Sequence, residues 1–314
     1  MPQSSDPRRA LLLAGLILCL APVAAQAQTL GMGAPDDPAP VEVLADNGIE
    51  WMRDGKRFVA RGNASAARND TTVYADTLTA HYRENAAGKS ELWRLDADGH
   101  VRIVSPTETA TGDTAVYDIG AAVLVLRGKP NAKLVTPDTT VTATEQLEYW
   151  DAKRFAVARG NAVVVRADRT LKADTVIAYF AAKTAAKSGK KAKSGNSGAP
   201  GQGSDIDIVD AHGHVVITTK TETVTGDKGR YNVKTGIATL LNNVGLTRGT
   251  DTLNGAYAVV NMNTGVSTLY SQLPGAKAEK PSPVRGRFIP KKAEPLPEED
   301  KGGAEGKKSA PVKP

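Results

Sequence analysis

The chain has 314 residues, a formal net charge of +6, only 5% aromatic residues and a single cysteine. One cysteine, Cys19, excludes an intramolecular disulfide and a thiolate metal site. The positive charge is concentrated in residues 181–204, which hold five lysines and no acid, and in residues 271–314, which hold ten basic and six acidic side chains. Because aromatic residues hardly interleave with these basic residues, the charge does not indicate a nucleic-acid partner.

The N-terminal residues have the pattern of a secretory signal. Arg8 and Arg9 precede an apolar run from Leu11 to Leu20, and Ala25-Gln26-Ala27 is a small-x-small cleavage site. The apolar run is shorter than the roughly 20 residues that span a bilayer. The sequence therefore predicts a signal peptide over residues 1–27, cleaved after Ala27, and an exported protein in which Cys19 leaves with the signal.

Composition divides the remaining chain into a folded part and three appendages. Residues 28–40 form a proline-rich lead, residues 181–204 are rich in Lys, Gly and Ser, and residues 271–314 are rich in Pro, Lys and Glu. Such compositions are typical of linkers and disordered segments. We therefore predict one domain over residues 41–270, interrupted by a flexible basic insert at 181–204 and followed by a disordered basic tail.

A repeated unit follows the first predicted hairpin, which spans residues 50–58 with Asp54-Gly55 as its turn. Each unit has an apolar lead-in, a Gly-Asn-type turn, an alternating run and a small residue followed by Asp, at a spacing of about 30 residues. In the first unit the small residue and the aspartate are Ala75 and Asp76. The six turns are Gly62-Asn63, Gly99-His100, Gly128-Lys129, Gly160-Asn161, Gly213-His214 and Asn242-Asn243.

Alternation of apolar and polar residues after each turn predicts short β-strands. Val101 and Ile103, for example, would share one face of a strand, with Arg102 on the other. One unit cannot bury its apolar face alone, so the units must stack around a common apolar interior. Alanines at Ala64 and Ala162 make that interior less apolar in places. We expect an all-β stack.

The polar residues give little indication of catalysis. His212 and His214 could bind a metal as a pair, but zinc usually requires three or four ligands. An aspartate recurs once per unit, which favours a structural role in a turn or at a strand edge over acid–base chemistry. These aspartates are Asp76, Asp113, Asp174 and Asp227. Without a nucleophile elbow, a P-loop or a zinc-protease motif, we expect no enzyme, no cofactor and no metal.

The ordered units resemble the LptA/OstA-like periplasmic lipopolysaccharide-transport family. The stretches that carry this resemblance are Phe58–Tyr82, Gly99–Tyr117, Gly160–Tyr179 and Gly213–Tyr231. The resemblance implies a twisted antiparallel β-jellyroll, V-shaped in section and open at both ends, that is located in the periplasm. Its apolar interior would hold the acyl chains of lipid A. In that family, domains join edge to edge into a bridge between the inner and outer membranes.

The resemblance also implies partners and contact residues. The edge near Val41–Val43 would meet an inner-membrane-anchored export component. The edge near Thr252–Leu269 would meet the outer-membrane translocon, and copies of the chain could associate edge to edge. Lipopolysaccharide would contact the apolar interior positions, which are Val41, Val43, Phe58, Val73, Val101, Ile103, Leu124, Leu126, Leu134, Val141, Val164, Leu171, Val215, Ile217, Val224, Val244, Leu246 and Leu253.

Two alternatives stay open at this point. An inner-membrane-anchored sister component of the same export system would retain the apolar run at its N-terminus. A β-solenoid surface protein or adhesin would bind no lipid and would have a filled interior. The insert and the tail would either contact anionic phosphates or act as solvated linkers, and their composition favours linkers.

Overall fold

The computed structural model describes residues 40–84, 88, 90–181, 206–275 and 283–289. Every regular element within these residues is a strand, and no helix among them is long and apolar enough to cross a membrane. The predicted signal peptide, nearly all of the proline-rich lead and nearly all of the basic insert lie outside the described residues. The strands are β1 (Glu42–Leu44), β2 (Ile49–Met52), β3 (Arg57–Arg68), β4 (Thr71–Glu84), β5 (Ser90–Val104), β6 (Thr109–Asp118), β7 (Val123–Arg127), β8 (Ala132–Val135), β9 (Thr139–Ala143), β10 (Gln146–Trp150), β11 (Phe155–Arg166), β12 (Arg169–Phe180), β13 (Ile206–Thr218), β14 (Thr223–Asn232), β15 (Ile237–Arg248), β16 (Asp251–Asn261), β17 (Val266–Tyr270) and β18 (Arg285–Arg287).

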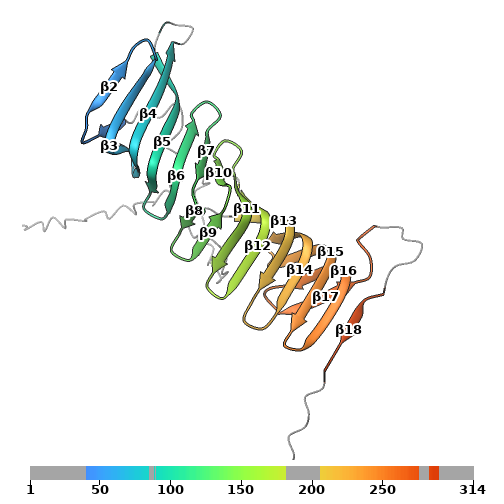
Figure 1. The fold of residues 1–314 in the computed structure, drawn as a ribbon. Helices are drawn as coiled ribbons and strands as arrows, with labels where there is room; N and C mark the ends of the chain where they lie inside the picture. Colours follow the sequence, from blue (N-terminus) through green and yellow to red (C-terminus); the bar gives the residue numbers. More distant parts are fainter. Residues whose placement is uncertain (1–39, 85–87, 89, 182–205, 276–282, 290–314) are drawn as a thin grey trace, which may run out of the picture.

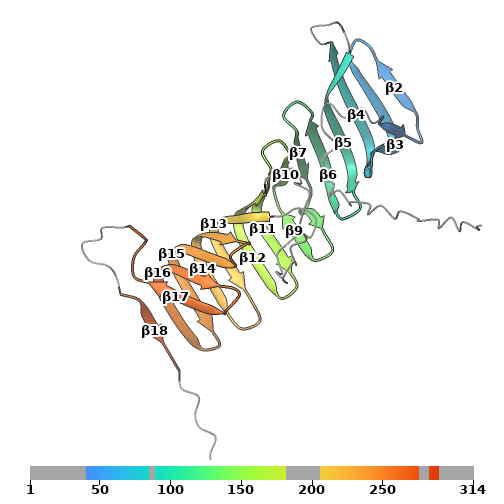
Figure 2. The ribbon, with the colours of Figure 1, turned by 180° about the vertical axis from the view of Figure 1, so that it is seen from behind.

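All 18 strands belong to one antiparallel sheet, in which strands close in sequence are also neighbours in space. Figure 1 shows them stacked one after another, from β2 and β3 in blue to β17 and β18 in orange and red, in a long twisted array. Figure 2 shows the same array from behind. The predicted all-β class is confirmed, but several strands are longer than predicted, with 14 residues in β4 and 15 in β5.

Most long strands bend near the middle. In β3, Gly62 (φ 76°) and Asn63 (φ 43°) have left-handed backbone, and the pairing with β4 shifts between Arg61 and Ala64. The strand continues past this point and does not reverse, so the prediction of a Gly-Asn turn is wrong. The pair forms a β-bulge, which inserts extra residues and bends a strand. The same left-handed pairs occur at Gly99-His100, Gly160-Asn161, Gly213-His214 and Asn242-Asn243.

The bends divide the sheet into two walls that meet at a vertex. The first wall contains β2, β7, β10 and β17, and the second wall contains β1, β8, β9 and β18. The long strands contribute one half to each wall, as β3 does by pairing with β2 before its bulge and with β1 after it. Because residues of both walls line the same cavities, the walls face each other across an apolar interior.

The residue directly after each bulge fills the vertex. Val101 and Val215 are 1% exposed, and Ala64 and Ala162 are 0% exposed. Alanine in this position pairs with alanine on the next strand, and valine pairs with glycine, so the two side chains together occupy a similar space. The pairs are Ala64↔Ala75, Val101↔Gly112, Ala132↔Ala143, Ala162↔Ala173, Val215↔Gly226 and Val244↔Gly255. The small interior residues therefore lie where the walls converge.

The repeated aspartates also lie beside the vertex, in mid-strand, whereas the sequence favoured a structural role in a turn or at a strand edge. The carboxylate of each aspartate forms a hydrogen bond with a residue of the bulge or the strand break on the next strand of the sheet. Asp76 lies 2.8 Å from His100 Nδ1, and this hydrogen bond and the charge of Asp76 raise the pKa of His100. The equivalent contacts are Asp174 with His214 Nδ1 (2.9 Å), Asp227 with Asn243 Nδ2 (2.9 Å) and Asp113 with the Lys129 N–H (2.6 Å).

The two ends of the predicted domain differ from expectation in detail. The first hairpin joins β2 to β3, but its left-handed residue is Lys56 (φ 47°) and not Gly55, so the loop is longer than a two-residue turn. At the other end, β18 lies within the segment predicted to be a disordered tail. It pairs with the first half of β16, while β17 pairs with the second half. Residues 276–282 and 290–314 lie outside the described part.

Candidate functional site

An apolar cavity of about 560 Å³ lies between the walls in the N-terminal half. Leu78 and Leu95 line it from the first wall, and Val73 and Ile103 line it from the second. Its volume falls in the range of about 300–1,000 Å³ that is typical of ligand pockets. The cavity reaches the N-terminal end of the sheet, where large apolar side chains are exposed by 37–56%: Val41, Val43, Ile49 and Trp51.

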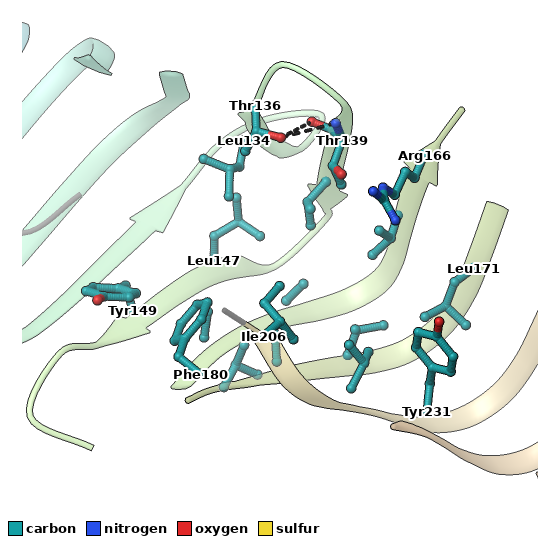
Figure 3. A pocket seen from close by; sticks show the side chains of 18 of the residues that line it. Leu134, Thr136, Thr139, Leu147, Tyr149, Arg166, Leu171, Phe180, Ile206 and Tyr231 are labelled. Atoms are coloured by element: carbon teal, nitrogen blue, oxygen red, sulfur yellow. Dashed lines mark hydrogen bonds between the residues drawn. The ribbon is translucent and has the colours of Figure 1, made fainter. Parts of the chain in front are cut away.

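A second apolar cavity, of about 270 Å³, lies in the C-terminal half. Figure 3 shows Leu134 and Leu147 on one side of it and Leu171 and Tyr231 on the other, with Phe180 and Ile206 between them. These side chains come from strands that are far apart in sequence, because each strand contributes one inward face to the array. The aromatic rings of Tyr149 and Phe180, with centroids 5.9 Å apart, pack at the end nearest the first cavity.

The two cavities lie on either side of the joint between β7 and β10. Leu124 lines both of them, and Leu147 packs against the buried clusters of both halves. The two strands pair in register with Leu124 opposite Tyr149 and Leu126 opposite Leu147, so these four side chains share one face. Apolar side chains therefore line the interior on both sides of this joint.

The structure brings together most of the predicted interior residues. Those that line a cavity are Val41, Val43, Phe58, Val73, Ile103, Leu124, Leu126, Leu134, Val141, Val164, Leu171 and Ile217. Six predicted positions line neither cavity. Val101, Val215 and Val244 fill the vertex, while Val224, Leu246 and Leu253 lie in register and pack on one another across β14, β15 and β16.

Some lining residues are absent from the prediction because they lie on the first wall. Leu78 and Val176 follow the recurring aspartates by two residues, and so does Ala115. An alternation that restarts after each aspartate was therefore a usable signal. Leu147, Tyr149 and Phe180 lie outside that spacing, and only the pairing of the strands brings them to the cavity.

The outer end of the second wall adds polar groups to the C-terminal cavity. Arg166 and Arg169 line it, and Arg166 is held by Asp138 at 3.0 Å. Glu108 lies at the same end, in the turn between β5 and β6, and burial raises its pKa from 4.5 to about 6. The cavity thus has apolar walls and a charged outer end, which suits an amphipathic ligand.

Replacing Glu108 with glutamine is expected to stabilise the protein above pH 6. The folded protein holds the Glu108 proton more tightly than the unfolded chain does. The stability from this group is therefore fully present below pH 4.5 and is lost as the pH rises through about 6. The loss amounts to about 2 kcal/mol at most. Urea unfolding at pH values on both sides of this window measures it, with Glu84→Gln on the exposed end of β4 as the control. Equal pH dependence in both variants would contradict the prediction.

The histidines and carboxylates do not assemble a metal centre within the described residues. No group of three or more metal-binding side chains occurs there. His214 pairs with Asp174, and the neighbouring His212 side chain is exposed.

Comparisons with known proteins point to one family. A family model described as "LptA/(LptD N-terminal domain) LPS transport protein" matches residues 42–146 and again residues 140–266. The two matches meet in the segment that contains β9 and β10, which is next to the joint between the cavities.

Two individual proteins are also similar to this chain. An uncharacterized protein of Rhizobium meliloti (strain 1021) is 26% identical over 129 residues, which are 38% of this chain and 68% of that protein. The crystal structure of LptH from Pseudomonas aeruginosa, described as the LptA homologous periplasmic component of the lipopolysaccharide transport device, is 17% identical. It covers 48% of this chain and 95% of its own, with a TM-score of 0.38.

Proposed function

Because this chain belongs to the LptA/(LptD N-terminal domain) family of LPS transport proteins, we propose that it is a periplasmic carrier of lipopolysaccharide. The acyl chains of lipid A would lie between the two walls, in the two cavities that Leu124 borders. The observation that supports this proposal is an apolar interior that is lined from both walls and has exposed apolar side chains at its N-terminal end.

The physical reason is the removal of acyl chains from water. Each CH₂ group that enters an apolar interior contributes about 0.8 kcal/mol. Polar and charged side chains on the outward faces, such as Arg102 and Lys172, keep the carrier itself in water. Carriage of this kind requires no bond making or breaking, so we propose a protein without enzymatic activity or cofactor. The energy for directional movement would come from another component of the export machinery.

A non-lipid-binding β-solenoid would have a filled interior. The cavities of about 560 and 270 Å³ favour the carrier over that alternative. The two ends of the sheet favour edge-to-edge contacts, because unpaired strand edges accept further strands. We place an inner-membrane-anchored partner at the N-terminal edge of β1 and β2. We place the outer-membrane translocon at the C-terminal edge near Thr252–Leu269, where β17 and β18 are the edge strands.

Photocrosslinking in cells tests the proposed ligand. A photoreactive side chain at Val73 or Leu171 is expected to crosslink to lipopolysaccharide, because these residues line the N-terminal and C-terminal cavities. Both are partly buried, so a larger side chain can enter the cavity space. The matched controls are Tyr74 and Lys172, the exposed next residues on the same strands, which face outward.

The outcome separates the carrier from its alternatives. Crosslinks at both inward positions and at neither outward position would support the proposal. Crosslinks at only one inward position would confine the ligand to one cavity. Equal yields at inward and outward positions, or no lipopolysaccharide at either inward position, would contradict carriage in the interior.

A further inference from the structure

The two halves of the chain begin with the same pair of strands. β1 pairs with the end of β3 and β2 with its beginning, and β9 and β10 pair in the same way with β11. The registers agree at a constant offset in numbering. The pairs Val43↔Ala66 and Ile49↔Ala60 of the first half correspond to Val141↔Val164 and Leu147↔Ala158 of the second. β9 and β10 are therefore the counterparts of β1 and β2.

The two halves also end with the same pair of strands. β6 pairs with β7 in the first wall and with β8 in the second, and β16 pairs in the same way with β17 and β18. These registers also agree at a constant offset. The pairs Ala115↔Leu126 and Ala110↔Leu134 of the first half correspond to Ala258↔Leu269 and Leu253↔Gly286 of the second. β17 and β18 are therefore the counterparts of β7 and β8.

The joint in the middle of the chain connects these two kinds of edge. β7 pairs with β10 in the first wall and β8 pairs with β9 in the second, and both pairings are antiparallel. At the ends of the array, β1, β2, β17 and β18 each pair with one strand only within the described residues. The joint therefore shows how an edge like that of β17 and β18 receives an edge like that of β1 and β2.

The apolar side chains at the two ends of the first wall suit this register. Transferred to the ends, the pairing of β7 with β10 places Ile49 of one copy opposite Leu269 of another. The neighbouring pair on the same face is the large Trp51 opposite the small Ser267. Ile49 and Trp51 are exposed by 52% and 56% in the single chain, so docking would remove apolar surface from water.

The two ends of the second wall are complementary in size and in charge. Transferred to the ends, the pairing of β8 with β9 places Val43 opposite Gly286 and Glu42 opposite Arg287. Leu253 fills the space beside Gly286, since a Cβ atom there would lie 3.0 Å from Leu253 Cδ2. Glu42 and Arg287 are both exposed, and opposite charges directly across two strands stabilise their pairing.

We propose that β17 and β18 of one copy dock onto β2 and β1 of a second copy, in the register of the joint inside the chain. This inference rests on the edge-to-edge contacts of the proposed function, and it assigns them a partner and a register. Each wall continues from one copy to the next by strand addition. The contact joins two different edges, so a stack can grow by further copies. The outermost edges of the stack remain for the inner-membrane and outer-membrane partners.

Disulfide crosslinking between two variants of the full chain tests the register. In a Cys19→Ser background, one chain carries Glu50→Cys and the other carries Thr268→Cys. The counterparts of these two positions are Glu148 and Val125, which are directly opposed in the joint. Directly opposed residues of antiparallel strands lie within disulfide reach. Oxidation of the mixture is expected to give a mixed disulfide dimer, identified by mass spectrometry.

Two controls separate docking from random collision. Each variant oxidised alone should give little dimer, because its cysteines are not opposed in this register. A Lys172→Cys chain in place of the Thr268→Cys chain should also lose the product, because Lys172 is exposed but lies in the middle of the array. Equal yields in the mixture and in the controls would overturn the proposal. Efficient dimerisation of the Glu50→Cys chain alone would also overturn it, since two β2 edges would then meet.

Exchange of the charges in the second wall provides an independent measurement. Glu42→Arg and, separately, Arg287→Glu are each expected to raise the concentration at which copies associate by about three- to tenfold, because like charges then face each other. The double variant restores opposite charges and is expected to return to within about twofold of the parent chain. Sedimentation velocity measures association. Copies that stay monomeric at every concentration, or a double variant weaker than both single variants, would overturn the proposal.

Lipopolysaccharide crosslinking at Val73 and Leu171 in the same variants reports on the proposed function separately. If these crosslinks persist while the copies stay apart, the docking proposal fails and the carrier function stands. If the copies associate in register and no lipopolysaccharide is crosslinked, the carrier function fails and the docking proposal stands.

Discussion

Replacing Leu240 with alanine is expected to lower the free energy of unfolding by about 3 to 5 kcal/mol. Leu240 lies in β15, is 0% exposed and belongs to the packed cluster of the C-terminal half. Its side chain packs against Gly226, since a Cβ atom added to Gly226 would lie 3.4 Å from the Leu240 side chain. Because Gly226 has no side chain, it cannot fill the space that Leu240→Ala would leave. Urea unfolding measures the effect as a lower midpoint with an unchanged slope.

Leu92→Ala is the matched control, because it removes the same atoms from a leucine that is 39% exposed. Its effect is expected to be about 1 kcal/mol. If Leu240→Ala proved no more harmful than Leu92→Ala, the C-terminal half would be loosely packed and the cavity there would not have the fixed shape described above.

Replacing Gly213 with alanine is expected to lower the free energy of unfolding by about 2 to 5 kcal/mol. Two effects combine at this bulge. Gly213 has a φ of 76°, a region that residues with a Cβ rarely adopt. The added Cβ would also overlap the carboxylate of Asp174, which is held in place by His214. Thermal or urea unfolding would show the loss.

Gly249→Ala separates the two effects. Gly249 has a φ of 59°, but an added Cβ would have no atom within 4 Å, so only backbone strain remains, about 1 kcal/mol. In the double variant Gly213→Ala with Asp174→Ala, the overlap is removed and the loss attributed to Gly213 should shrink towards that of Gly249→Ala. An unchanged loss would show that the Asp174 carboxylate does not restrict the bulge.

The inward positions of the second wall could be predicted from sequence because they depend on local alternation. Ile103 and Ile217 lie two residues beyond the first apolar residue after a bulge, and both line a cavity. Val101 and Val215 share their face of the strand, but lie at the vertex, where the walls are too close for a cavity. Distance from the vertex is a property of the folded sheet, so alternation alone could not separate the two sets.

Sequence alone does not distinguish these bulges from turns, because both have the same local signal. A two-residue Gly-Asn turn and the bulge at Gly62-Asn63 both require left-handed backbone at two successive residues. What distinguishes them is whether the flanking segments pair with each other or with neighbouring strands. In this protein the segments on both sides of Gly62-Asn63 pair with β4, which is a long-range choice that no local pattern contains.

The sequence does not predict β18, because its residues lack the alternating apolar pattern of a strand. Arg285-Gly286-Arg287 shows no apolar alternation, and its composition matches the surrounding tail. Its extended conformation depends on the edge of β16, with which it pairs. Tertiary context therefore overrides local propensity in this segment.

The vertex pairs restrict which substitutions this sequence can accept during evolution. Because Ala64 faces Ala75 and Val101 faces Gly112, mutation acts on the pair and not on either residue alone. An exchange of alanine for valine after a bulge would be tolerated best when glycine replaces the residue opposite, about a dozen positions along the chain. Relatives should therefore show correlated substitution at these positions, even where the rest of each repeat has diverged beyond recognition.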